Sequence, residues 1–86
     1  MESFASNDEF YAFVDGVSKR LADAGYQIHA QKLHRLLHQI AWTTSTELFG
    51  ELEQAFVEVR ATAQLSPELD LDLAHCLMAV RKALRR

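Results

Sequence analysis

The chain has little of what many protein classes need. Among its 86 residues are one cysteine, Cys76, one proline and three glycines. A lone cysteine excludes an internal disulfide and a zinc site built on several thiolates, and it favours a reducing, cytoplasmic setting. The scarcity of proline and glycine is unlike the composition of disordered or low-complexity chains. We therefore expect residues 1–86 to form one small globular domain with a single core.

An excess of basic residues and a long apolar run are also missing. Twelve acidic residues outnumber nine basic ones, whereas a nucleic-acid footprint needs an excess of lysine and arginine. No apolar run approaches the length of about 20 residues that a membrane-spanning helix needs. The opening MESFASNDEF lacks the basic start of a secretory signal. We expect neither a nucleic-acid partner nor a membrane segment.

What the sequence does contain is a helical pattern in four segments. Apolar residues recur three and four positions apart, which at about 100° per residue gathers them into one stripe on each segment. The predicted helices cover residues 7–24, 27–42, 45–63 and 67–85. The core stripe of the second is predicted to contain Ile28, Leu33, Leu36, Leu37 and Ile40. Because the connections are short, we predict an all-α, antiparallel up-down-up-down four-helix bundle.

Capping residues mark three of the four helix starts. Ser6 with Glu9, and Thr44 with Glu47, have the spacing of a capping box, in which a side chain at each end satisfies a backbone N–H of the other. The stretch SPEL at residues 66–69 places a serine at the N-cap and a proline at the first helical position.

Net charge alternates in sign from one predicted helix to the next. It is −3 for the first helix with its N-terminal arm, +2 for the second, −3 for the third and +1 for the fourth. Single exposed ion pairs stabilise little, but the alternation disfavours direct pairing of the first helix with the third. It also leaves acidic outer faces on those two helices.

Two stretches carry a resemblance to other proteins. TTSTELFGELEQAF (43–56) and LSPELDLDLAHCLMAVRKAL (65–84) resemble segments of small uncharacterised bacterial all-helical proteins, which have Thr/Ser-Glu-Leu and Pro-Glu-Leu helix starts. The resemblance covers roughly residues 20–84. It implies a helical fold and offers no catalytic residue that could be transferred to this chain.

Two histidines four residues apart, His34 and His38, are the candidate metal ligands. A zinc protease places a glutamate after the first histidine, whereas Arg35 occupies that position here. The helical spacing places both histidines on the flank of the second helix, and a third ligand would have to come from another helix or chain. We therefore expect no resident metal and no cofactor. His29 instead falls near the apolar sector and is expected to be partly buried and hydrogen-bonded.

Apolar residues on outer helix faces indicate a contact surface. Leu71 and Met78 lie about two turns apart, away from the core stripe of the fourth helix, and Val57 is similarly displaced on the third. Gly50 would allow a neighbour to approach closely. Cys76 lies on a core stripe, where a thiol is usually a small buried apolar group, and we expect no catalytic residues.

The leading interpretation is a non-enzymatic bundle that acts through protein–protein contact. We expect a homo-oligomer, most simply a homodimer, or a complex with another small protein, because small bundles commonly gain stability by association. Two alternatives stay open. One is an acidic inhibitor or antitoxin-like protein that masks a basic partner. The other is a metal-binding helical protein that uses the His-x-x-x-His pair.

Overall fold

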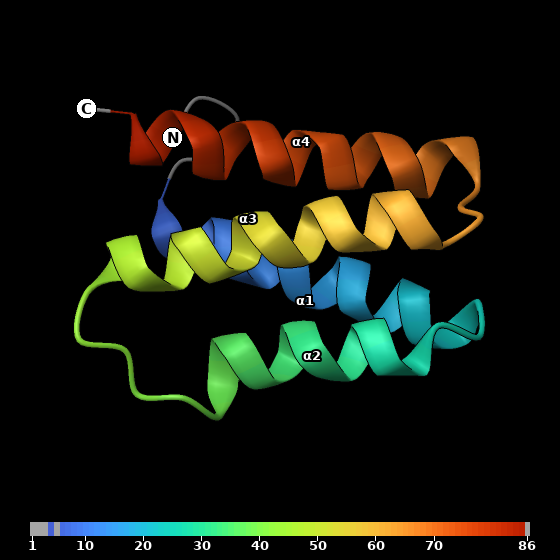
Figure 1. Ribbon diagram of the computed structural model, residues 1–86, viewed down its shortest axis with the longest axis horizontal. Coiled ribbons are helices and arrows are strands. Elements are labelled where there is room, and N and C mark those ends of the chain that lie inside the picture. The colour runs from blue at the N-terminus through green and yellow to red at the C-terminus, as the bar shows by residue number, and fades with distance from the viewer. Residues whose placement is uncertain (1–3, 5, 86) are drawn as a thin grey trace.

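Four helices lie side by side along the long dimension of the molecule (Figure 1). The computed structural model describes residues 4 and 6–85, so Glu2 and Arg86, which enter the charge totals above, lie outside the described residues. The helices are α1 (Asn7–Asp23), α2 (Gln27–His38), α3 (Ser45–Thr62) and α4 (Pro67–Leu84).

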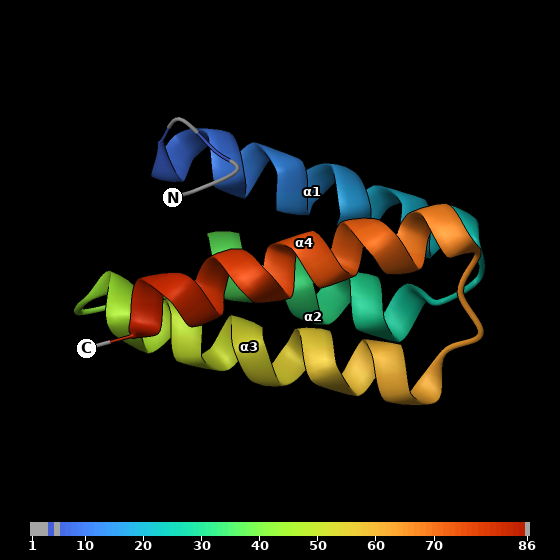
Figure 2. The same cartoon turned by 90° about the horizontal axis from the view of Figure 1, so that it is seen from above.

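Each helix contacts the two that are its neighbours in a square arrangement. α1 packs on α2 and α4, and α3 packs on α2 and α4, as the two perpendicular views show (Figures 1 and 2). Within the described residues, the backbones of the diagonal pairs, α1 with α3 and α2 with α4, do not approach one another closely. The predicted all-α, up-down four-helix bundle is confirmed.

Polar contacts join every pair of neighbouring helices. They follow from the alternation of net charge, since each helix finds opposite charges on its two neighbours. The ion pairs are Asp15–His38 between α1 and α2, Lys32–Glu58 between α2 and α3, Glu53–Arg81 and Arg60–Asp70 between α3 and α4, and Arg20–Asp72 between α1 and α4.

The second helix is shorter than predicted. It ends at His38, whereas the apolar pattern predicted an end at residue 42, and Ile40 lies 39% exposed in the following connection. The Trp42 indole Nε1–H donates a 2.6 Å hydrogen bond to the backbone carbonyl of Leu36. That carbonyl belongs to the last turn, where the helix itself offers no partner. The prediction was wrong because this side-chain contact, between residues six apart in the chain, competes with a further turn of helix.

The predicted core stripe of α2 is also wrong at its first member. Leu33 and Leu36 are buried and Leu37 is partly buried, but Ile28 is 81% exposed. Five residues separate Ile28 from Leu33, and at 3.6 residues per turn this spacing rotates the side chain by about 140° from the stripe. Ala30 takes the inward position instead. Its small side chain brings α2 close to α1.

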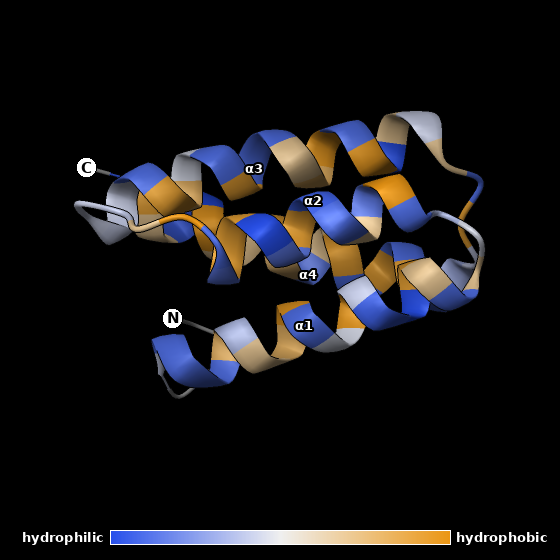
Figure 3. Cartoon of the chain, turned by 90° about the horizontal axis from the view of Figure 1, so that it is seen from below, coloured by the Kyte–Doolittle hydropathy of each residue, from blue (hydrophilic) through white to orange (hydrophobic). Residues whose placement is uncertain are grey.

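The core is aromatic toward the N-terminal end of α1. Phe10 is fully buried and meets Phe49 of α3 edge-on, with 5.9 Å between ring centroids. Phe4, which precedes α1, packs edge-on against Phe10 and Phe13 at 5.2 and 5.3 Å. Hydrophobic and hydrophilic stretches alternate along every helix (Figure 3). Among the described residues, no helix combines the length and hydropathy needed to cross a membrane.

The helix starts follow the predicted caps. The Thr44 and Glu47 capping box is complete, and the hydroxyl groups of Ser6 and Ser66 each accept a hydrogen bond from the N–H three residues on. Of the capping box predicted for Ser6 and Glu9, the structure forms the half in which Ser6 accepts from the Glu9 N–H. At the end of α1, Gly25 has a φ of +97°. This left-handed residue lets the next N–H, that of residue 26, bond back to the carbonyl of residue 21 at 2.8 Å, as in a Schellman motif.

Two connections meet at one end of the bundle. The Tyr26 hydroxyl group donates a 2.9 Å hydrogen bond to the carbonyl of Gln64 and accepts one of 3.0 Å from the Gln64 N–H. Tyr26 lies between α1 and α2, whereas Gln64 lies between α3 and α4. A single side chain therefore ties the α1–α2 hairpin to the α3–α4 hairpin.

Candidate functional site

An open groove lies between α1 and α2 on the outer surface. Its lining combines polar and basic side chains with a few apolar ones: Asp15, Ser18, Lys19 and Ala22 of α1, and Ile28, Ala30, Gln31, Lys32, His34, Arg35, His38 and Gln39 of α2 and its C-cap. Both candidate histidines are in this groove and are exposed, as their position on the helix flank predicts.

Asp15 joins the two histidines across the groove. One ligand atom from each of Asp15, His34 and His38 lies within 4.8 Å of the other two. His38 Nε2 is 2.8 and 2.9 Å from the two carboxylate oxygens of Asp15. The rings of His34 and His38 have centroids 4.7 Å apart. We refer to these three residues as the His/Asp cluster.

A buried hydrogen bond sets the register that assembles the cluster. The Ser18 hydroxyl group, on α1, donates a 2.8 Å hydrogen bond to the carbonyl of Ala30, on α2. Because the helices are antiparallel, the residue one turn before Ser18 comes level with the residue one turn after Ala30. Those residues are Asp15 and His34. The sequence of α2 alone gave no sign of this third ligand, because it belongs to another helix.

The charges around the cluster are mainly positive. Lys19, Lys32 and Arg35 line the same groove, and Lys32 is 3.8 Å from Glu58 of α3. These cations lower the affinity of the cluster for a dication. They also exclude the glutamate-based zinc-protease arrangement, because Arg35 stands where the general base would be needed.

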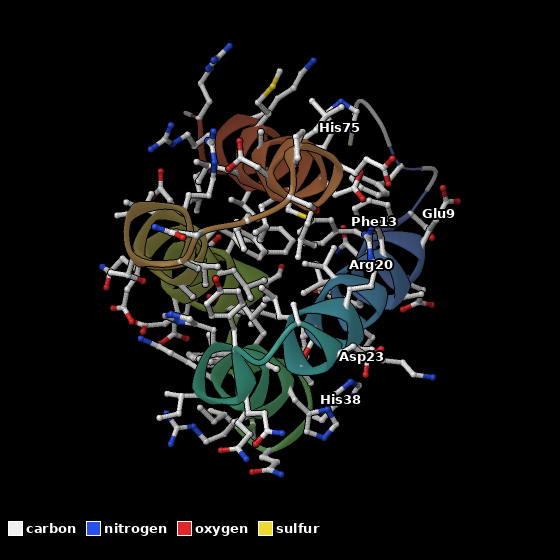
Figure 4. All side chains as sticks on the ribbon, turned by 90° about the vertical axis from the view of Figure 1, so that its right-hand side faces the viewer. Glu9, Phe13, Arg20, Asp23, His38 and His75 are labelled. Atoms are coloured by element: carbon white, nitrogen blue, oxygen red, sulfur yellow. The ribbon has the colours of Figure 1, made fainter. Side chains whose placement is uncertain are left out.

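His29 and His75 lie away from the groove cluster. His29 is partly buried, and its Nε2 is 3.1 Å from the Thr62 hydroxyl oxygen. That hydroxyl group already donates to the carbonyl of Glu58 at 2.7 Å, so it accepts its second bond from the His29 Nε2–H. This confirms the prediction of a partly buried, hydrogen-bonded His29. His75 is exposed on α4, and Figure 4 shows it on the opposite side of the bundle from His38.

Cys76 is buried in the core, as its place on the stripe of α4 predicts. Burial, and secondly the negative charge of Asp72, raise the pKa of the Cys76 thiol to about 12. A thiol with this pKa is protonated at neutral pH, and the thiolate is the form that attacks or binds a metal. Cys76 therefore serves as a small apolar group in packing.

A second candidate surface lies on the outer side of α3 and α4. Val57, Leu71 and Met78 are 42%, 59% and 64% exposed. Val57 is flanked along α3 by Glu53 and Arg60, whose ion partners Arg81 and Asp70 are on α4. Gly50 lies on the same side of α3, and a Cβ atom added there would meet no atom within 4 Å. We call Gly50, Val57, Leu71 and Met78 the α3/α4 face.

Comparison with known proteins gives no match for this chain among family models, curated proteins or solved structures. The proposals that follow rest on the exposure, contacts and charges of the described residues.

Proposed function

We propose that the protein is a non-enzymatic helical bundle that acts through protein–protein contact, and that it forms a homodimer through the α3/α4 face. The observation that supports this proposal is the exposure of three large apolar side chains on two adjacent helices, Val57 on α3 and Leu71 and Met78 on α4. One exposed apolar residue needs no explanation, but several on one surface are typical of a contact site.

The charges beside the α3/α4 face favour self-association. Glu53–Arg81 and Arg60–Asp70 place both signs of charge beside the apolar residues, at two levels along the helices. In a dimer whose two-fold axis passes through Val57 and runs across the helices, the Glu53–Arg81 pair of one copy faces the Arg60–Asp70 pair of the other. Acidic groups of one copy then approach basic groups of the other. Two-fold contacts use the same surface patch on both partners. The charges beside the α3/α4 face are complementary to those of a second copy in this arrangement.

Masking of a basic partner receives less support. Three acidic residues of α1 and α3, Asp15, Glu53 and Glu58, are already paired with a histidine or a cation of a neighbouring helix. These pairs weaken the negative field that α1 and α3 could present to a partner. For location we propose the cytoplasm, because the only thiol is free and buried within the chain.

Sedimentation equilibrium tests the homodimer. We expect the wild type to dimerise at micromolar concentrations and the double variant Leu71→Asp/Met78→Asp to be monomeric, because four carboxylates would then be buried in one dimer. Ile28→Asp is the matched control: it also places a charge on an exposed apolar residue, but on α2. A wild type that stays monomeric at high micromolar concentration would refute the homodimer, and an unchanged double variant would refute the face.

A further inference from the structure

We propose that the His/Asp cluster binds one divalent transition-metal ion, for which Zn²⁺ is the probe of choice. This site is separate from the proposed dimer contact, since it lies between α1 and α2 and the α3/α4 face lies on the other two helices. In this site Asp15 of α1 is the third ligand, which His34 and His38 on α2 need in addition to themselves.

The donor set suits late first-row metals. Two imidazole nitrogens and one carboxylate oxygen are common ligands of Zn²⁺, Ni²⁺, Co²⁺ and Cu²⁺, whereas Mg²⁺ and Ca²⁺ prefer oxygen alone. The cluster offers that set from Asp15, His34 and His38. Three protein ligands leave at least one coordination position for water, as in open zinc sites.

The distances are close to those a metal requires. Bonds of about 2.0–2.1 Å in tetrahedral geometry place ligand atoms roughly 3.3 Å apart. His38 Nε2 is already 2.8 and 2.9 Å from the Asp15 oxygens, and the widest separation in the cluster is within 4.8 Å. His34 and His38 are exposed, so side-chain rotation alone can close the remaining gap. The helices do not have to move, because the Ser18–Ala30 hydrogen bond holds their register.

The present contact between His38 and Asp15 describes the site without metal. In it, His38 Nε2 carries the proton that faces the carboxylate. A metal ion would take the place of this proton: His38 would bind as the neutral tautomer with its proton on Nδ1, so that the Nε2 lone pair meets the metal, and Asp15 would turn one oxygen to the same ion. An ion pair between two exposed side chains is weak, so its loss opposes binding only slightly.

The neighbouring cations limit how tightly the metal binds. Lys19 and Arg35 share the groove with the cluster, and Lys32 is held by Glu58. The side chains of Lys19 and Arg35 are exposed, so water screens their repulsion of a metal ion. We therefore expect a dissociation constant in the micromolar range.

Calorimetric titration of the tag-free, full-length protein with ZnCl₂ tests the site. We expect one ion per chain, and at least a tenfold loss of affinity in each of Asp15→Asn, His34→Gln and His38→Gln. His75→Gln is the matched control, because it removes an exposed histidine on the far side of the bundle (Figure 4) and is expected to bind as the wild type does. Circular dichroism confirms that each variant is folded.

Three results would overturn the proposal. The first is a wild-type dissociation constant for Zn²⁺ more than 100 times larger than the expected micromolar value. The second is an Asp15→Asn variant that binds like the wild type, which would leave only a two-histidine surface contact. The third is one ion per two chains, which would place the metal between copies. Leu71→Asp/Met78→Asp is expected to keep full Zn²⁺ affinity, so the metal site and the dimer can fail independently.

A second readout depends on the bridge between helices. An ion held by both α1 and α2 stabilises the folded chain, and at 100 times the dissociation constant the melting temperature is expected to rise by roughly 10 °C or more. In Asp15→Asn the remaining ligands are both on α2, so we expect a clearly smaller rise. An equal rise in the two proteins would contradict the bridging site.

Discussion

Gly16 and Gly50 have room for a methyl group that they lack. Gly16 lies in the middle of α1 and Gly50 in the first half of α3. A Cβ atom added at either position would meet no atom within 4 Å outside its own helix backbone. Substitution by alanine therefore changes the backbone entropy of the unfolded chain without creating a clash.

The size of the gain follows from helix propensity. Alanine is more favourable than glycine in a helix interior by about 0.8–1.0 kcal/mol. For a domain of this length, 1 kcal/mol moves the melting temperature by about 4–8 °C. We expect Gly16→Ala and Gly50→Ala each to raise the melting temperature by about 4 °C or more, and the double variant by the sum, because the two sites are on different helices and an added methyl group at either meets no neighbouring atom.

The assay is thermal and urea unfolding at a concentration well below the dimer dissociation constant, where association does not add to stability. Sedimentation then separates the two glycines. Gly50 belongs to the α3/α4 face and Gly16 does not. We expect Gly50→Ala to weaken the dimer by holding the copies further apart, and Gly16→Ala to leave it unchanged.

Gly25 supplies the opposite case. Its φ of +97° is one that an L side chain rarely adopts, and a left-handed conformation costs a residue such as alanine about 1–2 kcal/mol. Gly25→Ala is therefore expected to lower the melting temperature, although space for the methyl group is open there too. A destabilised Gly50→Ala, or an unaffected Gly25→Ala, would refute the reasoning that separates space from backbone conformation.

Two further predictions concern single side chains. Cys76 has a thiol pKa of about 12 in the folded chain, above its ordinary value, so the folded state holds a proton that the unfolded state loses first. Stability from this group is complete below about pH 9 and declines toward pH 12; urea unfolding should show that decline flattened in Cys76→Ala, and an equal slope in the two proteins would contradict it. Tyr26→Phe removes two hydrogen bonds to Gln64 and is expected to lower the free energy of unfolding by about 1 kcal/mol. An unchanged value would mean that the tie between the two connections adds nothing.

The sequence was a good guide where the physics is local. Caps at Thr44 and Ser66 depend on residues within one turn, and both start the helices where their spacing predicted. The end of α2 is set by a side-chain hydrogen bond rather than by the apolar pattern. It depends on Trp42 reaching the Leu36 carbonyl, which no periodicity in the sequence records.

The candidate site divides in the same way. That His34 and His38 lie on the helix flank follows from a spacing of four on one helix. Asp15 is 19 residues from the first of them, and only the antiparallel register set at Ser18 brings it near. Ile28 shows the converse, because its apolar side chain predicts a core position, whereas its angle on the helix turns it toward solvent.

The position of Trp42 makes the chain its own optical probe. It is the only tryptophan, and its indole N–H is bonded at the connection between the two helical hairpins. Its fluorescence therefore reports the closure of that connection, whereas far-ultraviolet circular dichroism reports all four helices together. Coincidence of the two signals during unfolding would show that the hairpins separate only when they melt. An earlier change in fluorescence would show that the two hairpins separate at this connection while the four helices are still formed.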